Sequence, residues 1–70
     1  MQTTLAFIQD DRATLHLYCY ADFHRYEMTY IVAIAYGGKH TAKAFKSFKT
    51  ACKWFNDQCD KIGAPLWKLW

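Results

Sequence analysis

The sequence predicts a small α+β domain in which an antiparallel sheet of three or four strands packs against one C-terminal amphipathic helix, in the order β-β-β-β-α. Three observations predict this fold class. Residues 13–23 alternate apolar and polar side chains, residues 28–36 form an uncharged run rich in β-branched and aromatic residues, and residues 48–62 carry apolar side chains at helical spacing. Because 70 residues provide for one domain and no more, we assign residues 1–70 to a single domain.

The first two strands are predicted at residues 3–8 and 13–23, on either side of the polar turn residues 9–12. Successive side chains of a strand point to opposite sides of the sheet. The alternation therefore sends the odd-numbered residues from Leu15 to Phe23 to the core and the even-numbered residues from Thr14 to Asp22 to the opposite side.

A third strand is predicted at residues 28–36, and the Tyr-Gly-Gly-Lys segment at 36–39 predicts a tight hairpin into a fourth strand, because adjacent glycines supply positive φ. Two registers are open. A three-residue loop would place Val32 opposite Ala44, whereas a two-residue loop would place Val32 opposite Lys43 on one face. We favour the three-residue loop because a lysine on that face is harder to bury.

A helix is predicted to begin after Ser47, its N-cap, and to end at Gly63, with Pro65 preventing its continuation. Its apolar stripe consists of Phe48, Ala51, Cys52, Phe55, Cys59 and Ile62. The aromatic residues assigned to the core are Phe7, Phe23, Tyr30, Phe48 and Phe55, with Phe45 closing one end. Residues 66–70 are too apolar to remain in solvent, so we expect them to dock on the sheet or helix, or to meet a partner.

Composition argues against a membrane protein, since the longest apolar run, residues 30–36, has seven residues and a spanning helix needs about twenty. The N-terminus lacks the basic start and apolar stretch of a signal peptide, so the expected compartment is the cytoplasm. An odd number of cysteines without paired spacing predicts buried thiols rather than disulfides or a zinc site; they are Cys19, Cys52 and Cys59.

The sequence contains no motif of a known catalytic site, neither a nucleophile elbow nor a phosphate-binding loop nor a zinc-protease helix. His16 and His24 are the candidate general bases, but no suggestively placed carboxylate pair accompanies them. We therefore expect a protein that is not an enzyme and that needs no cofactor and no metal.

A binding function has more support than catalysis, because a single helix on a small sheet cannot bury all thirteen aromatic side chains. Exposed tyrosine and tryptophan are typical anchors of protein interfaces. The predicted protein-binding residues are His16, Tyr18, Tyr20, Arg25, Tyr26 and Trp54. Two other interpretations stay open: these aromatics cover the domain's own hydrophobic edge, or they form a homodimer contact.

The formal net charge of +3 is unevenly placed. Five lysines fall in a stretch without an acidic residue: Lys39, Lys43, Lys46, Lys49 and Lys53. Such a cluster attracts phosphate, which makes these lysines the nucleic-acid-binding candidates. It is equally compatible with the solvated face that any small domain needs.

Residues 30–57 resemble the AP2-like arm-type DNA-binding domains of phage integrases. The similarity consists of a strand, a Gly37-Gly38-Lys39 hairpin, a strand ending in Ala44-Phe45-Lys46-Ser47, and a helix with Ala51 and Trp54-Phe55. The resemblance implies a three-stranded sheet that enters a DNA groove and a helix that braces it. The family has basic residues on the reading face of its sheet, whereas residues 28–36 are uncharged here; only Lys39, Lys43 and Lys46 could serve.

The chain also resembles, in type rather than by motif, the small single-domain phage proteins that block a host machine by binding to it, anti-CRISPR proteins among them. This analogy implies a non-catalytic inhibitor in the host cytoplasm, whose partner is a host defence or nucleic-acid-handling protein complex. The alternative is a small DNA-binding accessory protein that uses the lysine-rich hairpin and helix.

Overall fold

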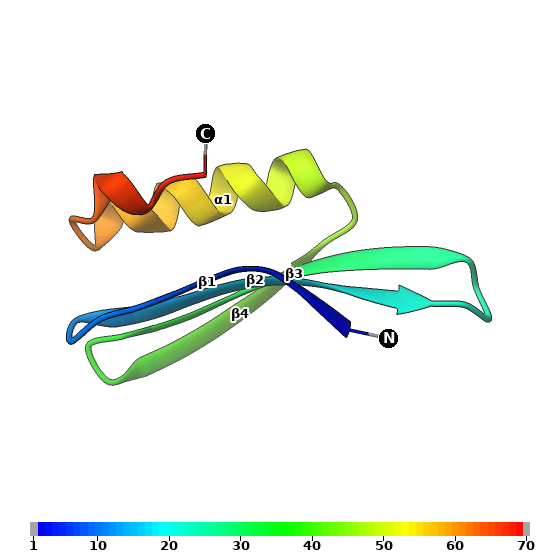
Figure 1. The fold of residues 1–70 in the computed structure, drawn as a ribbon, viewed down its shortest axis with the longest axis horizontal. Coiled ribbons are helices and arrows are strands. Elements are labelled where there is room, and N and C mark those ends of the chain that lie inside the picture. Colours follow the sequence, from blue (N-terminus) through cyan, green and yellow to red (C-terminus); the bar gives the residue numbers. More distant parts are fainter. Residues whose placement is uncertain (1, 70) are drawn as a thin grey trace.

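The computed structural model describes residues 2–69 and shows a four-stranded antiparallel sheet followed by one helix, which confirms the predicted fold class. The sheet order is β1-β2-β3-β4, so that every strand pairs with its neighbour in the sequence. The elements are β1 (Gln2–Gln9), β2 (Ala13–Asp22), β3 (Glu27–Tyr36), β4 (Lys39–Phe45), α1 (Phe48–Lys61) and the one-turn helix η1 (Pro65–Trp67). Figure 1 shows α1 along one side of the sheet, with the β2–β3 hairpin projecting past the helix.

The β1–β2 turn is held by the side chain of Asp10. Its carboxylate accepts hydrogen bonds from the backbone N–H groups of Arg12 at 2.7 Å and Ala13 at 3.1 Å. The guanidinium of Arg12 adds an ion pair at 2.9 Å. These bonds hold the pKa of Asp10 below its usual value, chiefly through the Arg12 backbone N–H.

The β3–β4 hairpin has the two-residue loop, so the predicted three-residue register is wrong. Tyr36 pairs with Lys39, and Val32 therefore lies opposite Lys43. Gly37 and Gly38 have φ angles of 60° and 80°, the geometry of the two-residue turn that matches strand twist. Because β4 is an edge strand, Lys43 keeps its ammonium in solvent while its Nζ lies 5.5 Å from the ring centre of Phe45.

The core lies between α1 and the side of the sheet formed by the odd-numbered residues of β2 and the even-numbered residues of β3. The largest side chains that are entirely removed from solvent are Leu15, Leu17, Val32, Phe55 and Cys59. All three cysteines are free and buried, as predicted. Burial of this apolar area from both layers stabilises the fold, at roughly 25 cal/mol per Å².

Both ends of α1 follow the prediction. Ser47 Oγ accepts a hydrogen bond from the N–H of Thr50 at 3.4 Å. Gly63, with a φ of 74°, donates its N–H to Asp60, and Ala64 donates to Cys59 at 2.8 Å. This pair of bonds satisfies the last carbonyls of the helix and turns the chain back along it.

The C-terminal segment docks on α1, one of the two predicted outcomes. The side chain of Asn56 forms two hydrogen bonds with the backbone of Leu69, at 2.8 and 2.7 Å. The ammonium of Lys68 pairs with Asp60 at 2.7 Å. The ring of Trp67 packs against the core, with the guanidinium of Arg12 at 5.6 Å from its centre. Trp70 lies outside the described residues.

Two aromatic residues assigned to the core are not there. Phe7 is 55% exposed because it pairs with His16, which points away from α1; an irregularity of the strand at residues 4–6 makes Ala6 and Ile8 the core-facing residues of β1. Phe23 is 67% exposed, and it follows β2 in the hairpin that projects past the helix. Tyr30, Phe48 and Phe45 are half-buried against the core as expected.

Within residues 2–69, no helix has the length and apolar character needed to cross a membrane.

Candidate protein-interaction surface

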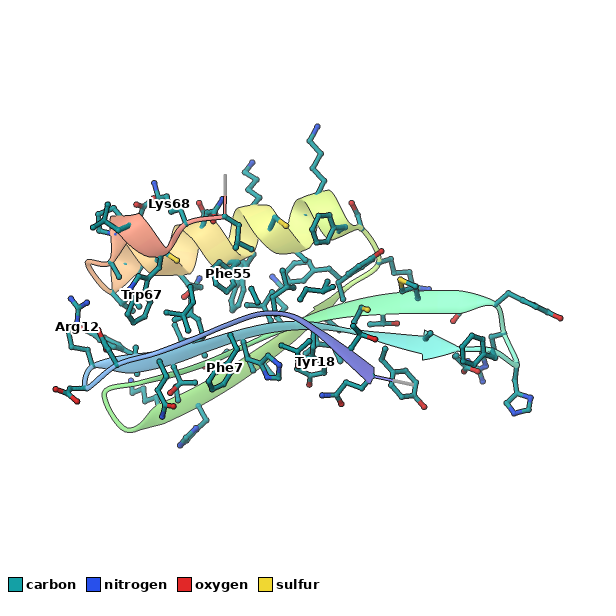
Figure 2. All side chains as sticks on the ribbon, viewed as in Figure 1. Phe7, Arg12, Tyr18, Phe55, Trp67 and Lys68 are labelled. Carbon is teal, nitrogen blue, oxygen red and sulfur yellow. The ribbon has the colours of Figure 1, made fainter. Side chains whose placement is uncertain are left out.

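The side of the sheet away from α1 is not covered by any segment of residues 2–69 (Figure 1). Figure 2 shows Phe7 and Tyr18 pointing to this side, whereas Phe55 and Trp67 lie on the other, between α1 and the sheet. We call it the open face. The strand pairings assign to it Gln2, Thr4, Phe7, Gln9, Thr14, His16, Tyr18, Tyr20, Asp22, Glu27, Thr29, Ile31, Ala33, Ala35, His40, Ala42 and Ala44.

Aromatic rings form a continuous row over β1 and β2 on the open face. Phe7 meets His16 edge-on at 5.4 Å between ring centres, and His16 lies 4.7 Å from Tyr18. The hydroxyl of Thr4 lies 3.0 Å from Nε2 of His16. Rings that already support one another lose little further freedom when a partner binds, so this row suits an interface.

The other half of the open face, over β3 and β4, is lined largely by alanines, with Ile31 and His40 as its larger side chains. Ala33 pairs with Ala42, and Ile31 pairs with Ala44. A shallow hollow of about 230 Å³ lies here, between Ala33, Ala35 and Ala42. The open face thus consists of a ridge of rings beside a low alanine-rich strip.

The part of the open face that spans all four strands bears no formal charge. None of its residues is Lys, Arg, Asp or Glu; the pair Asp22 and Glu27 lies on the same side of the sheet but farther out, beyond Tyr20 and Thr29 on the projecting hairpin. Phosphate binding relies on basic side chains. The chemistry of the open face is therefore suited to an uncharged protein surface.

The structure brings together three of the six predicted protein-binding residues, since His16, Tyr18 and Tyr20 all lie on the open face along β2. Arg25 and Tyr26 lie in the turn at the end of the same hairpin. Tyr26 is 94% exposed and is the only described non-glycine residue with positive φ, at 54°. These two residues lie beyond the last paired residues of the sheet, Asp22 and Glu27.

Trp54 does not belong to this surface, and its predicted position outside the core is wrong. It lies on α1, on the other side of the sheet, half-buried against the core. Its ring centre is 5.9 Å from that of Phe45, because a large ring on the flank of the apolar stripe reaches the edge strand β4. Phe7 is the residue that sequence reasoning missed for the open face, since its side depends on the irregularity in β1.

The five predicted nucleic-acid-binding lysines lie elsewhere. Lys39 and Lys43 point to the α1 side of β4, Lys46 follows β4, and Lys49 and Lys53 are exposed on α1. The groove of about 560 Å³ beside α1 mixes lysines with acidic residues, including Asp57 and Asp60. Within residues 2–69, the five lysines therefore lie apart from the open face.

Among residues 2–69, no group of three or more His, Cys, Asp or Glu side chains is placed to hold a metal ion. Burial raises the pKa of the Cys52 thiol, and burial together with the charge of Asp60 raises that of Cys59. These thiols stay protonated at neutral pH, and a protonated thiol is a poor nucleophile.

The fold and surface define a β-β-β-β-α domain with one uncovered, aromatic sheet face whose four-stranded part is uncharged. No family model, curated protein or solved structure matches this chain. Its function is therefore argued from its own surfaces.

Proposed function

We propose that the chain is a non-catalytic protein-binding module that binds another protein through the open face. The observation that carries the proposal is the contrast between the two sides of the sheet: α1 and the C-terminal segment cover one side, and a row of rings stands uncovered on the other. Exposed apolar area is unfavourable in water, and a contiguous patch of it on a small protein is a typical interaction site.

The inhibitor role implied by the analogy with small phage proteins is compatible with this surface, because blocking a host complex requires surface complementarity and no chemistry. A host defence or nucleic-acid-handling complex as the target stays a prediction. Within the proposal, Tyr18 is the central anchor, since it lies midway along β2 between His16 and Tyr20.

Capture experiments with single substitutions test the assignment of the face. Tyr18→Ala is expected to reduce capture of a partner protein by about 30-fold, the loss of about 2 kcal/mol typical of a central interface tyrosine. Tyr36→Ala is the matched control, because Tyr36 lies on β3 with its side chain on the α1 side. Circular dichroism checks that both variants are folded. Unchanged capture by a folded Tyr18→Ala protein would contradict the proposal.

Duplex DNA binding is the alternative, and its five lysines would act from the β4–α1 side. Binding through five phosphates should give a log–log salt slope of about −4 to −5. A titration of the chain with duplex DNA at low salt measures this, and absence of affinity there would eliminate the alternative.

A further inference from the structure

We infer that the protein bound to the open face is a second copy of this chain, in a two-fold symmetric dimer whose sheets pack face to face. The inference rests on the proposed function, because it names the occupant of the proposed surface. It follows from the distribution of large and small side chains across the four strands.

The strand pairings place Phe7, His16, Ala33 and Ala42 in one row across the sheet, in the order β1 to β4. The next row, in the same order, is Thr4, Tyr18, Ile31 and Ala44. The aromatic side chains of the first row are on β1 and β2, and the one of the second row is on β2. In both rows the residue on β4 is alanine. Each copy therefore carries a ridge and a strip of lower side chains that lie parallel to each other.

A two-fold axis along the strands, between β2 and β3, turns this arrangement into a complementary pair. The axis places β1 of one copy over β4 of the other, so that Phe7 lies above Ala42 of the second copy and His16 above its Ala33. Both contacts occur twice in a symmetric dimer. An axis across the strands would instead stack ridge on ridge and leave a gap between the alanine strips.

Charge and size agree with this arrangement. The rows that cross all four strands contain no formal charge that would have to be buried, since Asp22 and Glu27 lie beyond them on the projecting hairpin. The row of Gln9, Thr14, Ala35 and His40 places a polar pair, Gln9 and His40 of the second copy, at the rim. Four strands about 4.8 Å apart and seven residues long present about 450 Å² in plan, so two copies bury about 900 Å² or more. Accessible surface exceeds plan area because side chains project from the sheet, so the interface reaches the roughly 1,000 Å² of accessible surface at which specific interfaces begin.

The edges of the sheet are less suited to pairing with a second copy. The edge strand β4 carries Lys39 and Lys43, and the edge strand β1 is interrupted at residues 4–6. Charged side chains and irregular strands are the devices that prevent edge-to-edge association. The face is therefore the surface that a second copy fits.

Crosslinking tests the geometry directly. Gln9→Cys and His40→Cys are prepared as separate single variants, mixed, and treated with a short bismaleimide. Within one copy the two positions lie three strand spacings apart, about 14 Å, whereas in the dimer position 9 faces position 40 across the interface. The mixture should give a crosslinked dimer; each variant alone and the wild type, whose thiols are buried, should not. Equal crosslinking in all samples would overturn the proposed geometry.

Sedimentation equilibrium tests the association itself. Ala42→Lys places two lysines per dimer under the facing Phe7 rings and should raise the dimer dissociation constant by about 100-fold or more. Thr41→Lys is the matched control on the same strand, with its side chain on the α1 side, and should leave it unchanged. A wild type that is monomeric at millimolar concentration, or a dimer insensitive to Ala42→Lys, would overturn the inference.

The two proposals fail separately. A monomeric chain that captures a different protein in a Tyr18-dependent manner would overturn the dimer and leave the proposed function standing. A monomeric chain whose protein contacts are all unaffected by folded Tyr18→Ala would overturn both.

Discussion

Replacing phenylalanine by alanine on the two sides of the sheet should have very different effects on stability. Phe55 has no exposed surface and belongs to the core, so Phe55→Ala should cost about 3–5 kcal/mol of unfolding free energy through lost burial and a residual cavity. Phe7 is 55% exposed, so Phe7→Ala removes less than half of a full burial, about 1 kcal/mol or less. At about 0.05–0.15 kcal/mol per residue, the whole domain is stable by only about 4–10 kcal/mol.

Urea unfolding followed by circular dichroism measures both effects, at protein concentrations low enough that self-association does not contribute. We expect the midpoint of Phe55→Ala to fall by a third or more of its wild-type value, and that of Phe7→Ala to change little. Should Phe55→Ala not fold at all, Phe55→Leu supplies a graded loss of about 1.5 kcal/mol or less. Equal midpoint shifts for Phe7→Ala and Phe55→Ala would refute the assignment of covered and open sides.

Three further predictions concern the two ends of the C-terminal segment and the β1–β2 turn. Gly63→Ala should cost about 1 kcal/mol in urea unfolding, because a φ of 74° strains alanine although the surrounding space is open. Asn56→Ala should cost about 1–3 kcal/mol and speed amide exchange at Leu69, because two hydrogen bonds are lost. The lowered pKa of Asp10 contributes stability that is present above pH 3.8 and is lost as the pH falls through the pKa of the folded state. In acid titrations of unfolding, Asp10→Asn should lack this loss of stability. An acid unfolding curve identical to that of the wild type would contradict the prediction.

The elements that the sequence predicted correctly are those specified by neighbouring residues. The alternation in β2, the serine cap of α1 and the glycine that ends it each act within one or two turns of chain. The same local pattern predicted that His16, Tyr18 and Tyr20 share a face. Period and capping are sufficient for such assignments, because they depend on backbone geometry rather than on distant contacts.

The errors all involve contacts between distant segments. The two-residue hairpin loop was rejected because it places Lys43 on the core side of the sheet. Its ammonium nevertheless reaches solvent, because β4 is an edge strand. Phe7 was assigned by residue type, whereas one unpaired residue in β1 reverses the side on which it lies. Trp54 was placed by helical period alone, whereas its ring reaches Phe45 across the layer boundary.

Local chemistry was thus enough to specify four strands, one helix and a β2 strand with two unlike sides. The packing of α1 and the C-terminal segment decided which side of the sheet is covered and which aromatic rings lie together on the uncovered side. The reason is that a strand pattern defines two sides symmetrically, and only the packing of a second layer makes one of them the core.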